Sequence, residues 1–171
     1  VSNILTAAGL RDSRVVERRP GNFGEDCRKV LDEFAPRFAA AGVTLATYTI
    51  EDAPIERDPE AIRHVLRNLL DNALKFTPEG GRVEVDLKVD EDQAILTVHD
   101  NGPGMAPDVL DRATEEFYRG PNSSNHGGTG LGLYLVRSLL AAHDGQLELS
   151  SVGVGCGLRA VASLPIRGAA V

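Results

Sequence analysis

The chain has 171 residues, a size typical of one domain, and its hydrophobic fraction of 42% suffices for one core without disulfides or a structural metal. The absence of tryptophan predicts a core built mainly from Leu, Val, Ile and Ala. A formal net charge of −7 argues against nonspecific binding of nucleic acid, which needs a basic surface, but it leaves room for one local anion site.

Other large classes of protein are also disfavoured. Cys27 and Cys156 lie far apart, so they form neither a metal-ligand pair nor a disulfide framework, and their use fits a reducing compartment. No run approaches 18 apolar residues, so the sequence predicts no membrane span. The first residues lack the pattern of a signal peptide.

The N-terminal part of the chain predicts two helices and a strand. Residues 1–12 look like the tail of a longer helix, too short to be stable alone. A helix is predicted over 25–41, where Pro36 is expected to cause a kink or an early stop and Gly42 follows the end. The alternating residues 43–50 predict a strand. The apolar stripe of the helix comprises Val30, Leu31, Phe34 and Phe38.

The middle and the end of the chain alternate helices with paired strands. Asp58 followed by Pro59 is a typical helix start, so a helix is predicted over 59–76. The later predicted elements are strands at 82–89 and 93–99, a helix from near 129 to 143, and strands at 145–151 and 157–164. This order predicts an α+β fold, a two-layer α/β sandwich in which helices cover one face of a single mixed sheet.

The predicted helix 59–76 has two distinct faces. Its apolar face comprises Ile62, Leu66, Leu69, Leu70, Ala73 and Leu74. Asn68, Asn72 and Lys75 share the opposite face at spacings of four and three residues. An amide oxygen can bind Mg²⁺ and a lysine can reach a phosphate, so this face is a candidate site. The alternative is an ordinary solvated face.

Two glycine-rich segments follow predicted strands or precede a predicted helix. Residues 100–104 place Asp100 at a strand end before Gly102 and Gly104, a turn that lets a ligand approach the backbone. There Asp100 is a candidate to accept a hydrogen bond from adenine N6, whereas guanine carries a carbonyl at that position. The alternative is an ordinary Asn-Gly turn.

The second segment, residues 127–133, runs directly into a predicted helix. Exposed amides at a helix N-terminus bind anions, each contact contributing about 0.3–1 kcal/mol when exposed. The segment lacks the Gly-Lys-Ser/Thr ending of a Walker A loop, and no strand precedes it as in a dinucleotide fingerprint. The alternative is a flexible glycine-rich hinge.

Between the glycine segments, residues 116–120 carry two aromatic side chains and an arginine in polar surroundings. This composition predicts a mobile lid, in which Phe117 pins the lid to the body and Arg119 meets a phosphate. The alternative is a surface arginine beside an isolated aromatic anchor.

Together these segments resemble the four boxes of the ATP-binding domain of sensor histidine kinases, in the superfamily shared with gyrase B, Hsp90 and MutL. The corresponding segments are residues 68–78 for the N box, 100–104 for the first glycine box, 116–119 for the F box and 128–133 for the second glycine box. Order and spacing also match, over roughly residues 20–165. The resemblance implies a Bergerat-type fold, whose sheet is mixed but mostly antiparallel.

The resemblance also implies roles for individual residues. Asn72 would bind Mg²⁺, Asn68 would support the metal or the phosphates, and Asp100 would read adenine. The implied catalytic residues are Asn68, Lys75 and Arg119. The implied nucleotide-binding set is Asn68, Asn72, Lys75, Phe76, Asp100, Gly102, Gly104, Met105, Phe117, Arg119, Gly128, Thr129, Gly130, Leu131, Gly132 and Leu133. Within it, Phe76 and Leu133 would help to wall the base, and residues 105–128 would form the ATP lid.

The implied chemistry is transfer of the γ-phosphoryl group of Mg-ATP to a histidine, with relay to an aspartate of a response regulator receiver domain. The four histidines lie outside the context of a phosphoacceptor: His64, His99, His126 and His143. The acceptor is therefore expected on separate dimerisation helices of the same kinase, a homodimer in its parent form. The resemblance further implies a cytoplasmic location, whether or not the parent is anchored in a membrane.

The implied division of the chain has three parts. Residues 1–20 would be the end of the dimerisation helix and a linker, residues 21–167 the ATP-binding domain and residues 168–171 a tail.

Three alternatives stay open. A gyrase-, Hsp90- or MutL-type ATPase would place a glutamate base where this chain has Asn68, which cannot activate water. A serine kinase of the anti-sigma-factor type would be shorter. A degenerate binding module would have lost one of the boxes, yet all four look intact.

Overall fold

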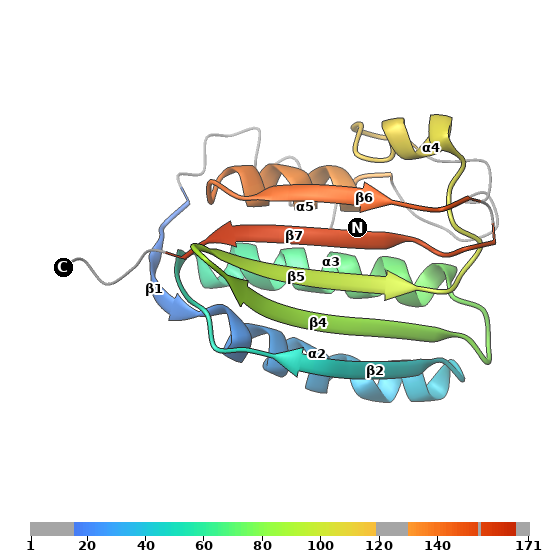
Figure 1. Ribbon diagram of the computed structural model, residues 1–171, viewed down its shortest axis with the longest axis horizontal. Helices are drawn as coiled ribbons and strands as arrows, with labels where there is room; N and C mark the ends of the chain where they lie inside the picture. Colours follow the sequence, from blue (N-terminus) through green and yellow to red (C-terminus); the bar gives the residue numbers. More distant parts are fainter. Residues whose placement is uncertain (1–15, 119–129, 154, 167–171) are drawn as a thin grey trace.

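Five strands form one mixed sheet in the computed structural model, which describes residues 16–118, 130–153 and 155–166. Their order across the sheet is β2 (Thr44–Ile50), β4 (Arg82–Asp90), β5 (Gln93–Asp100), β7 (Arg159–Pro165) and β6 (Gln146–Ser150) (Figure 1). Only the β2–β4 pair is parallel, and the other three pairs are antiparallel. The prediction for residues 1–12 lies outside the described residues.

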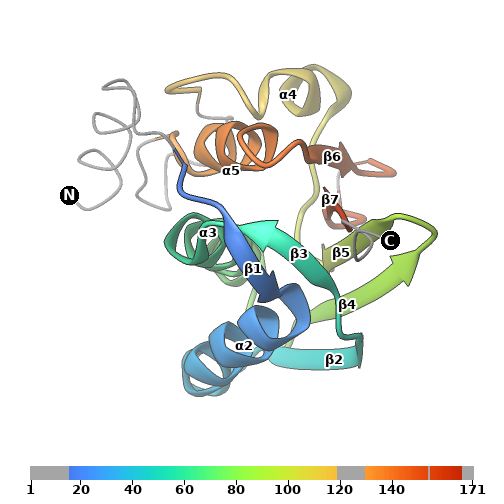
Figure 2. The same cartoon turned by 90° about the vertical axis from the view of Figure 1, so that its left-hand side faces the viewer.

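Three helices cover one face of this sheet: α2 (Phe23–Ala40), α3 (Pro59–Phe76) and α5 (Gly132–Ala141). Figure 2 shows them side by side as a second layer, and no described helix lies on the opposite face of the sheet. The predicted two-layer α+β sandwich is therefore confirmed. None of the helices in the described ranges is both long and apolar enough to cross a bilayer.

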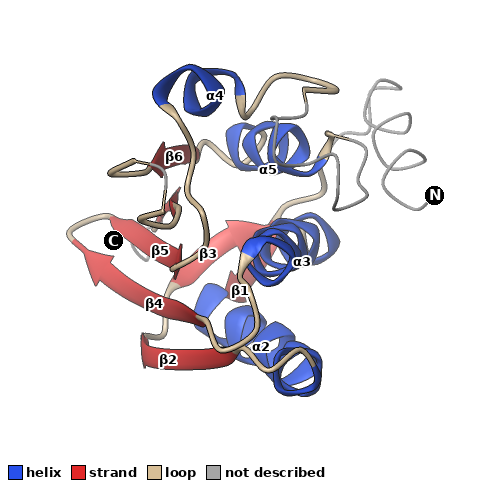
Figure 3. Ribbon diagram, turned by 90° about the vertical axis from the view of Figure 1, so that its right-hand side faces the viewer, coloured by secondary structure: helices blue, strands red, loops and turns tan. Residues whose placement is uncertain are grey.

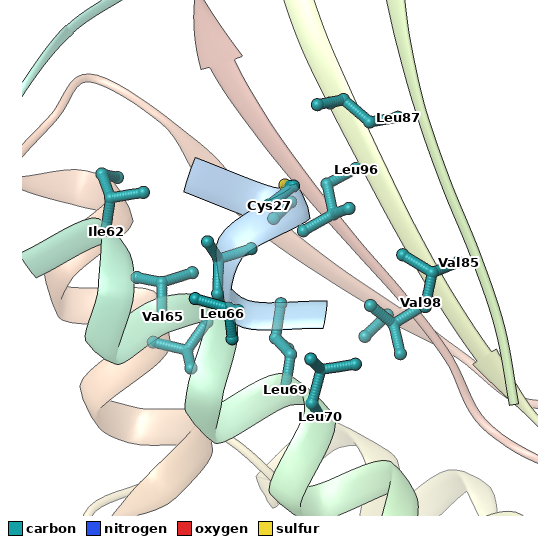
Figure 4. Close-up of a cluster of buried hydrophobic side chains, with 14 of the residues drawn as sticks. Cys27, Ile62, Val65, Leu66, Leu69, Leu70, Val85, Leu87, Leu96 and Val98 are labelled. Carbon is teal, nitrogen blue, oxygen red and sulfur yellow. The ribbon is translucent and has the colours of Figure 1, made fainter. Parts of the chain in front are cut away.

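The core lies between this helical layer and the sheet. Along β5, buried and half-buried side chains alternate, so Leu96 and Val98 face the helices. The apolar face of α3 packs against them, with Leu66 and Leu69 nearly inaccessible (Figure 4). Burying each such side chain contributes about 1.5–3 kcal/mol, which fixes the rotation of α3 and turns its polar face away from the sheet. Leu74, predicted on the apolar face, is only half-buried.

Helix α2 continues through Pro36 to Ala40, so the expected early stop is wrong. Pro36 is exposed, and a carbonyl that lacks its helical partner on the solvent side can be hydrogen-bonded by water. Gly42 follows the C-cap with a φ of 66°, in agreement with its predicted role as terminator.

Three short elements were not predicted from the sequence. Strands β1 (Arg19–Asn22) and β3 (Pro54–Arg57) pair with each other antiparallel (Figure 2), and β1 lies at the left-hand end of the five-stranded sheet in Figure 1. Both have four residues, too few to show an alternating pattern. The third element is the six-residue helix α4 (Pro107–Arg112).

The described fold crosses the boundary predicted between residues 20 and 21, because β1 spans it. A mostly buried ion pair between Arg57 Nε and Asp26 Oδ2, at 2.8 Å, ties β3 to α2. Arg18 adds a contact to the end of α5, donating to the carbonyl oxygen of Ala142 at 3.1 Å. The division of the chain into three parts stays a prediction.

Candidate nucleotide-binding site

The described elements that carry predicted site residues meet toward one end of the sheet, the right-hand end in Figure 1 and the end facing the viewer in Figure 3. The last turns of α3, the end of β5 and the first turn of α5 meet there. The chain leaves β5 toward α4 at the same end (Figure 3). The described residues of the loop between β6 and β7, 151–153 and 155–158, complete this end of the molecule.

Helix α3 begins as predicted, because the Asp58 carboxylate accepts hydrogen bonds from the amides of Glu60 and Ala61. Its bounds set the positions of Asn68 and Asn72, both half-buried on the face opposite the core. The side-chain NH₂ of Asn68 donates to the carbonyl oxygen of His64 at 2.8 Å, which orients its Oδ1 outward from the helix turn.

The second glycine segment packs directly onto this face. A Cβ built on Gly132 would lie 3.3 Å from Asn68 Oδ1. The structure therefore brings Asn68 of the N box next to Gly132 at the start of α5, although these residues are 64 positions apart in sequence. Among the residues that the structure describes, no side chain caps the N-terminus of α5, and the first turn of this helix contains no acidic residue. Its first amides are thus available to an anion.

Asp100 ends β5 and is buried, with 6% of its surface exposed. Its Oδ1 accepts two backbone hydrogen bonds, from Gly102 N at 2.9 Å and from Leu158 N at 3.2 Å. Within the described ranges, both hydrogen bonds to the carboxylate fall on Oδ1. Burial raises the pKa of Asp100, and the two backbone donors oppose that rise. One carboxylate oxygen therefore fixes the side chain, and Oδ2 is left for a ligand donor.

The glycines of residues 100–104 make room for the protein as much as for a ligand. A Cβ on Gly102 would lie 2.5 Å from the carbonyl oxygen of Phe76 at the end of α3. Gly104 has a φ of 69°, and a Cβ there would lie 2.5 Å from the carbonyl oxygen of Gly153. The sequence analysis explained these glycines by the approach of a ligand. In the structure, the close approaches that require them come from α3 and from the β6–β7 loop.

The β6–β7 loop is the part of the site that sequence reasoning missed. Gly157 N donates to the carbonyl oxygen of Gly102 at 3.0 Å, and Gly155 N donates to that of Pro103. Gly157 itself has a φ of 76°, and a Cβ there would lie 1.8 Å from the carbonyl oxygen of Asp100. The available signal was the run of glycines at 153, 155 and 157, which marks backbone that approaches other backbone closely.

The described part of the predicted lid does not have the expected anchor. The side chain of Phe117 is 61% exposed, with a backbone φ of 62°, so the prediction that it pins the lid to the body is wrong for this conformation. Tyr118 makes the aromatic contact instead, with the Arg112 guanidinium 4.3 Å from its ring. Polar sequence alone does not show which of two adjacent aromatics faces the protein. Arg119, Gly128 and Thr129 lie outside the described residues.

The remaining members of the predicted set lie in two groups. Gly130, with a φ of 71°, packs against the carbonyl oxygen of Tyr118, and a Cβ there would lie 2.6 Å away. Leu131 and Leu133 are buried, and Leu133 belongs to the main core, so at most its edge is available to wall a base. The Lys75 ammonium lies 5.0 Å from the Phe76 ring centroid.

The donor set favours a cation held jointly with phosphate. In the part of the chain that the structure describes, no group of three or more His, Cys, Asp or Glu residues is arranged to hold a metal ion. The amide oxygens of Asn68 and Asn72 are hard ligands of the kind Mg²⁺ accepts when phosphates and water supply the rest. The residues present therefore fit Mg²⁺ bound together with a nucleotide.

A buried carboxylate, uncapped helix amides and a lysine beside two asparagines define a nucleotide-binding domain of the α+β class. Residues 57–168 match the family model described as "Histidine kinase-, DNA gyrase B-, and HSP90-like ATPase". This match spans more than half of the chain, which therefore belongs to that family.

Its relatives include named sensor kinases. The chain is 37% identical over 128 residues to the adaptive-response sensory kinase SasA of Rippkaea orientalis, covering 74% of this chain and 33% of that protein. It is 31% identical over 166 residues to the sensor protein kinase PmrB of Pseudomonas aeruginosa, covering 96% of this chain and 35% of that protein. The chain thus spans about a third of the length of these curated relatives.

Solved structures agree in fold. The mycobacterial sensor histidine kinase MprB superposes with a TM-score of 0.76 at 28% identity, covering 89% of this chain and 99% of that one. Full-length ShkA, in complex with AMPPNP, gives a TM-score of 0.82 at 28% identity, covering 99% of this chain and 36% of that one. The predicted resemblance and the Bergerat-type fold are confirmed.

Proposed function

We propose that this chain is the ATP-binding catalytic domain of a sensor histidine kinase. It binds Mg-ATP and donates the γ-phosphoryl group to a histidine on the dimerisation helices of the same kinase. A response regulator receiver domain then takes the phosphoryl group onto an aspartate. The proposal places the domain in the cytoplasm, where ATP is available.

The nucleotide assignment rests on the carboxylate of Asp100, of which only Oδ1 accepts hydrogen bonds from the described residues. Its Oδ1 is held by the amides of Gly102 and Leu158, so its Oδ2 has a fixed direction. A buried acceptor of fixed direction selects a ligand with a matching donor, as the adenine 6-amino group provides. The AMPPNP bound in the ShkA structure supports an adenine nucleotide as the ligand.

The phosphate side of the site lies along α3 and the start of α5. Lys75 and Arg119 contact the phosphates, and the first amides of α5 add a backbone anion site. Asn72 holds Mg²⁺, which neutralises charge on the phosphates when it is bound. Little covalent chemistry is asked of the protein, because phosphoryl transfer depends mainly on positioning and charge neutralisation.

Transfer is favoured over hydrolysis by the side chain at position 68. Asn68 faces the start of α5, with its Oδ1 near Gly132 and its NH₂ bonded to the His64 carbonyl. An amide has no proton-accepting nitrogen and cannot serve as the general base for an attacking water. The names of the relatives SasA and PmrB, both kinases, support the same choice.

The proposal is tested by measuring phosphoryl transfer from this chain to a separately produced dimerisation hairpin. We expect the chain, supplied with Mg-ATP, to place an acid-labile phosphoryl group on a separately produced dimerisation hairpin of its own kinase. Asn72→Ala should remove the Mg²⁺ dependence of ATP binding in calorimetry. The matched control is Asp71→Ala, on the exposed side of the same helix turn, where the carboxylate pairs with Arg37 at 2.6 Å.

Two results would contradict the proposal. One is an acid-labile label on a histidine of the chain itself when no hairpin is present. The other is release of free phosphate that is as fast without the hairpin as transfer is with it, which would indicate an ATPase.

A further inference from the structure

One hydroxyl group of the β6–β7 loop touches the point where the lid leaves the sheet. Ser151 Oγ accepts a hydrogen bond from the amide of Met105 at 3.1 Å. It also lies 2.7 Å from the carbonyl oxygen of Gly157, to which it donates. A hydroxyl can serve both partners, because it carries one proton and two lone pairs. Ser151 therefore links the segment that follows β5, at Met105, to the β6–β7 loop, at Gly157.

The same loop also holds Asp100. Leu158 N donates to Asp100 Oδ1 at 3.2 Å, and Asp100 N donates back to the Leu158 carbonyl at 3.0 Å. Residues 100 and 105 are thus both hydrogen-bonded to the same loop, Asp100 to its last residue, Leu158, and Met105 to its first, Ser151. Whatever shifts Ser151 changes the position of Met105 relative to the carboxylate.

Close packing leaves this bridge little freedom. Gly104, just before Met105, has a φ of 69°, and a Cβ there would lie 2.7 Å from Ser151 Oγ. The hydroxyl lies so close to the Gly104 backbone that a bulkier side chain at 104 would displace it. The closeness of Oγ to the Gly104 backbone agrees with a direct hydrogen bond between Oγ and the amide of the next residue, Met105.

We propose that Ser151 is a positioning residue of the nucleotide site, whose hydroxyl sets the first residues of the ATP lid against the buried carboxylate. The inference rests on the proposed function, because it assumes that ATP binds between Asp100 and this lid. Ser151 acts through Met105 and need not touch the nucleotide. Its effect therefore depends on the hydroxyl and little on the bulk of the side chain.

Three variants separate the hydroxyl from the bulk of the side chain: Ser151→Ala, Ser151→Val and Ser151→Thr. Alanine and valine remove the hydroxyl, and threonine retains it in the shape of valine. Losing the hydrogen bonds of this hydroxyl to the Met105 amide and to the Gly157 carbonyl should weaken ATP binding about 3- to 10-fold in calorimetry. Threonine should stay within about 2-fold of the wild-type chain, a rescue that a purely steric role would not give.

A spectroscopic signal reports the contact itself. Met105 is the single methionine of the chain, so ¹⁵N-methionine labelling follows the amide that donates to Ser151. Its hydrogen exchange should be at least about 10-fold faster in the alanine and valine variants than in the wild-type chain. Urea unfolding measured in parallel shows whether that increase exceeds what a change in global stability explains.

Three outcomes overturn the inference. ATP affinity and Met105 exchange in Ser151→Ala equal to those of the wild-type chain would do so. So would a threonine variant as weak as the valine variant, or a loss of affinity fully matched by a loss of global stability. A wild-type chain that binds no ATP would instead reject the proposed function and, with it, the assumption on which this inference rests.

Discussion

Two buried polar residues, Asp100 and His143, lie at opposite ends of the sheet and use their hydrogen-bonding capacity differently. His143 follows α5 and has 1% of its surface exposed. Its Nδ1 lies 2.7 Å from the Leu139 carbonyl oxygen, and its Nε2 accepts from Asp58 N at 3.0 Å. Both ring nitrogens are thus used inside the protein. Asp100 has both of its backbone hydrogen bonds on Oδ1.

Burial alone does not distinguish these two residues. It raises the pKa of Asp100 and lowers the pKa of His143, in both cases by disfavouring the charged form. The distinguishing feature is whether the protein completes the hydrogen bonds of the buried group. Where it does, as at His143, the group joins two helices. Where an oxygen is left for a donor, as at Asp100, the group is suited to a ligand.

The largest effect that sharpens this contrast is expected from Asp100→Asn. The amide keeps an acceptor for Gly102 and Leu158 but presents an NH₂ where the adenine amine needs an acceptor. We expect ATP affinity to fall by roughly 100- to 1000-fold, because a charge-assisted hydrogen bond is lost and two donors face each other. Calorimetry measures the affinity, and urea unfolding should show a stability close to that of the wild-type chain. An affinity within 3-fold of the wild-type value would show that Asp100 does not recognise the adenine of ATP.

The reciprocal change, His143→Leu, should affect stability and spare the nucleotide. It leaves the amide of Asp58 and the carbonyl of Leu139 without their side-chain partner in a buried region. We expect the free energy of unfolding to fall by about 2–3 kcal/mol in urea titrations. The ATP affinity of the folded variant should change less than about 3-fold. A large loss of affinity with unchanged stability would contradict the contrast between His143 and Asp100.

The smallest effect concerns pH. The pKa of His143 is lowered in the folded state, so the unfolded chain takes up a proton first as the pH falls. Stability should therefore decrease below about pH 6.5, by at most about 1.4 kcal/mol per pH unit from this group. Asp100 has the opposite sign, because its raised pKa makes acid favour the folded state. Urea unfolding at pH 5–7.5 checks this, and His143→Leu should flatten the curve.

Local chemistry made the helix of the N box predictable to the residue. Asp58 and Pro59 start α3, and its apolar face fixes which side Asn68 and Asn72 occupy. The position of Asp100 at a strand end was equally local. These features depend on neighbours within a few residues, which a sequence displays directly.

The rest of the site depends on residues far apart in the chain. The amide of Leu158 that holds Asp100 comes from a loop 58 positions away. The β1–β3 pair joins residues 19 and 57, and each strand has only four residues, too few to show an alternating pattern. The choice between Phe117 and Tyr118 as the lid contact depends on tertiary packing against Arg112. Spacing in the sequence could not show any of these.

The position of β7 between β5 and β6 has a consequence for biosynthesis. The last strand of the domain is an inner strand, so the sheet cannot close while the ribosome still holds this segment. Leu158, which helps to fix the Asp100 carboxylate, lies immediately before that strand. A nascent chain therefore acquires its nucleotide pocket only after β7 has left the ribosome and can pair between β5 and β6.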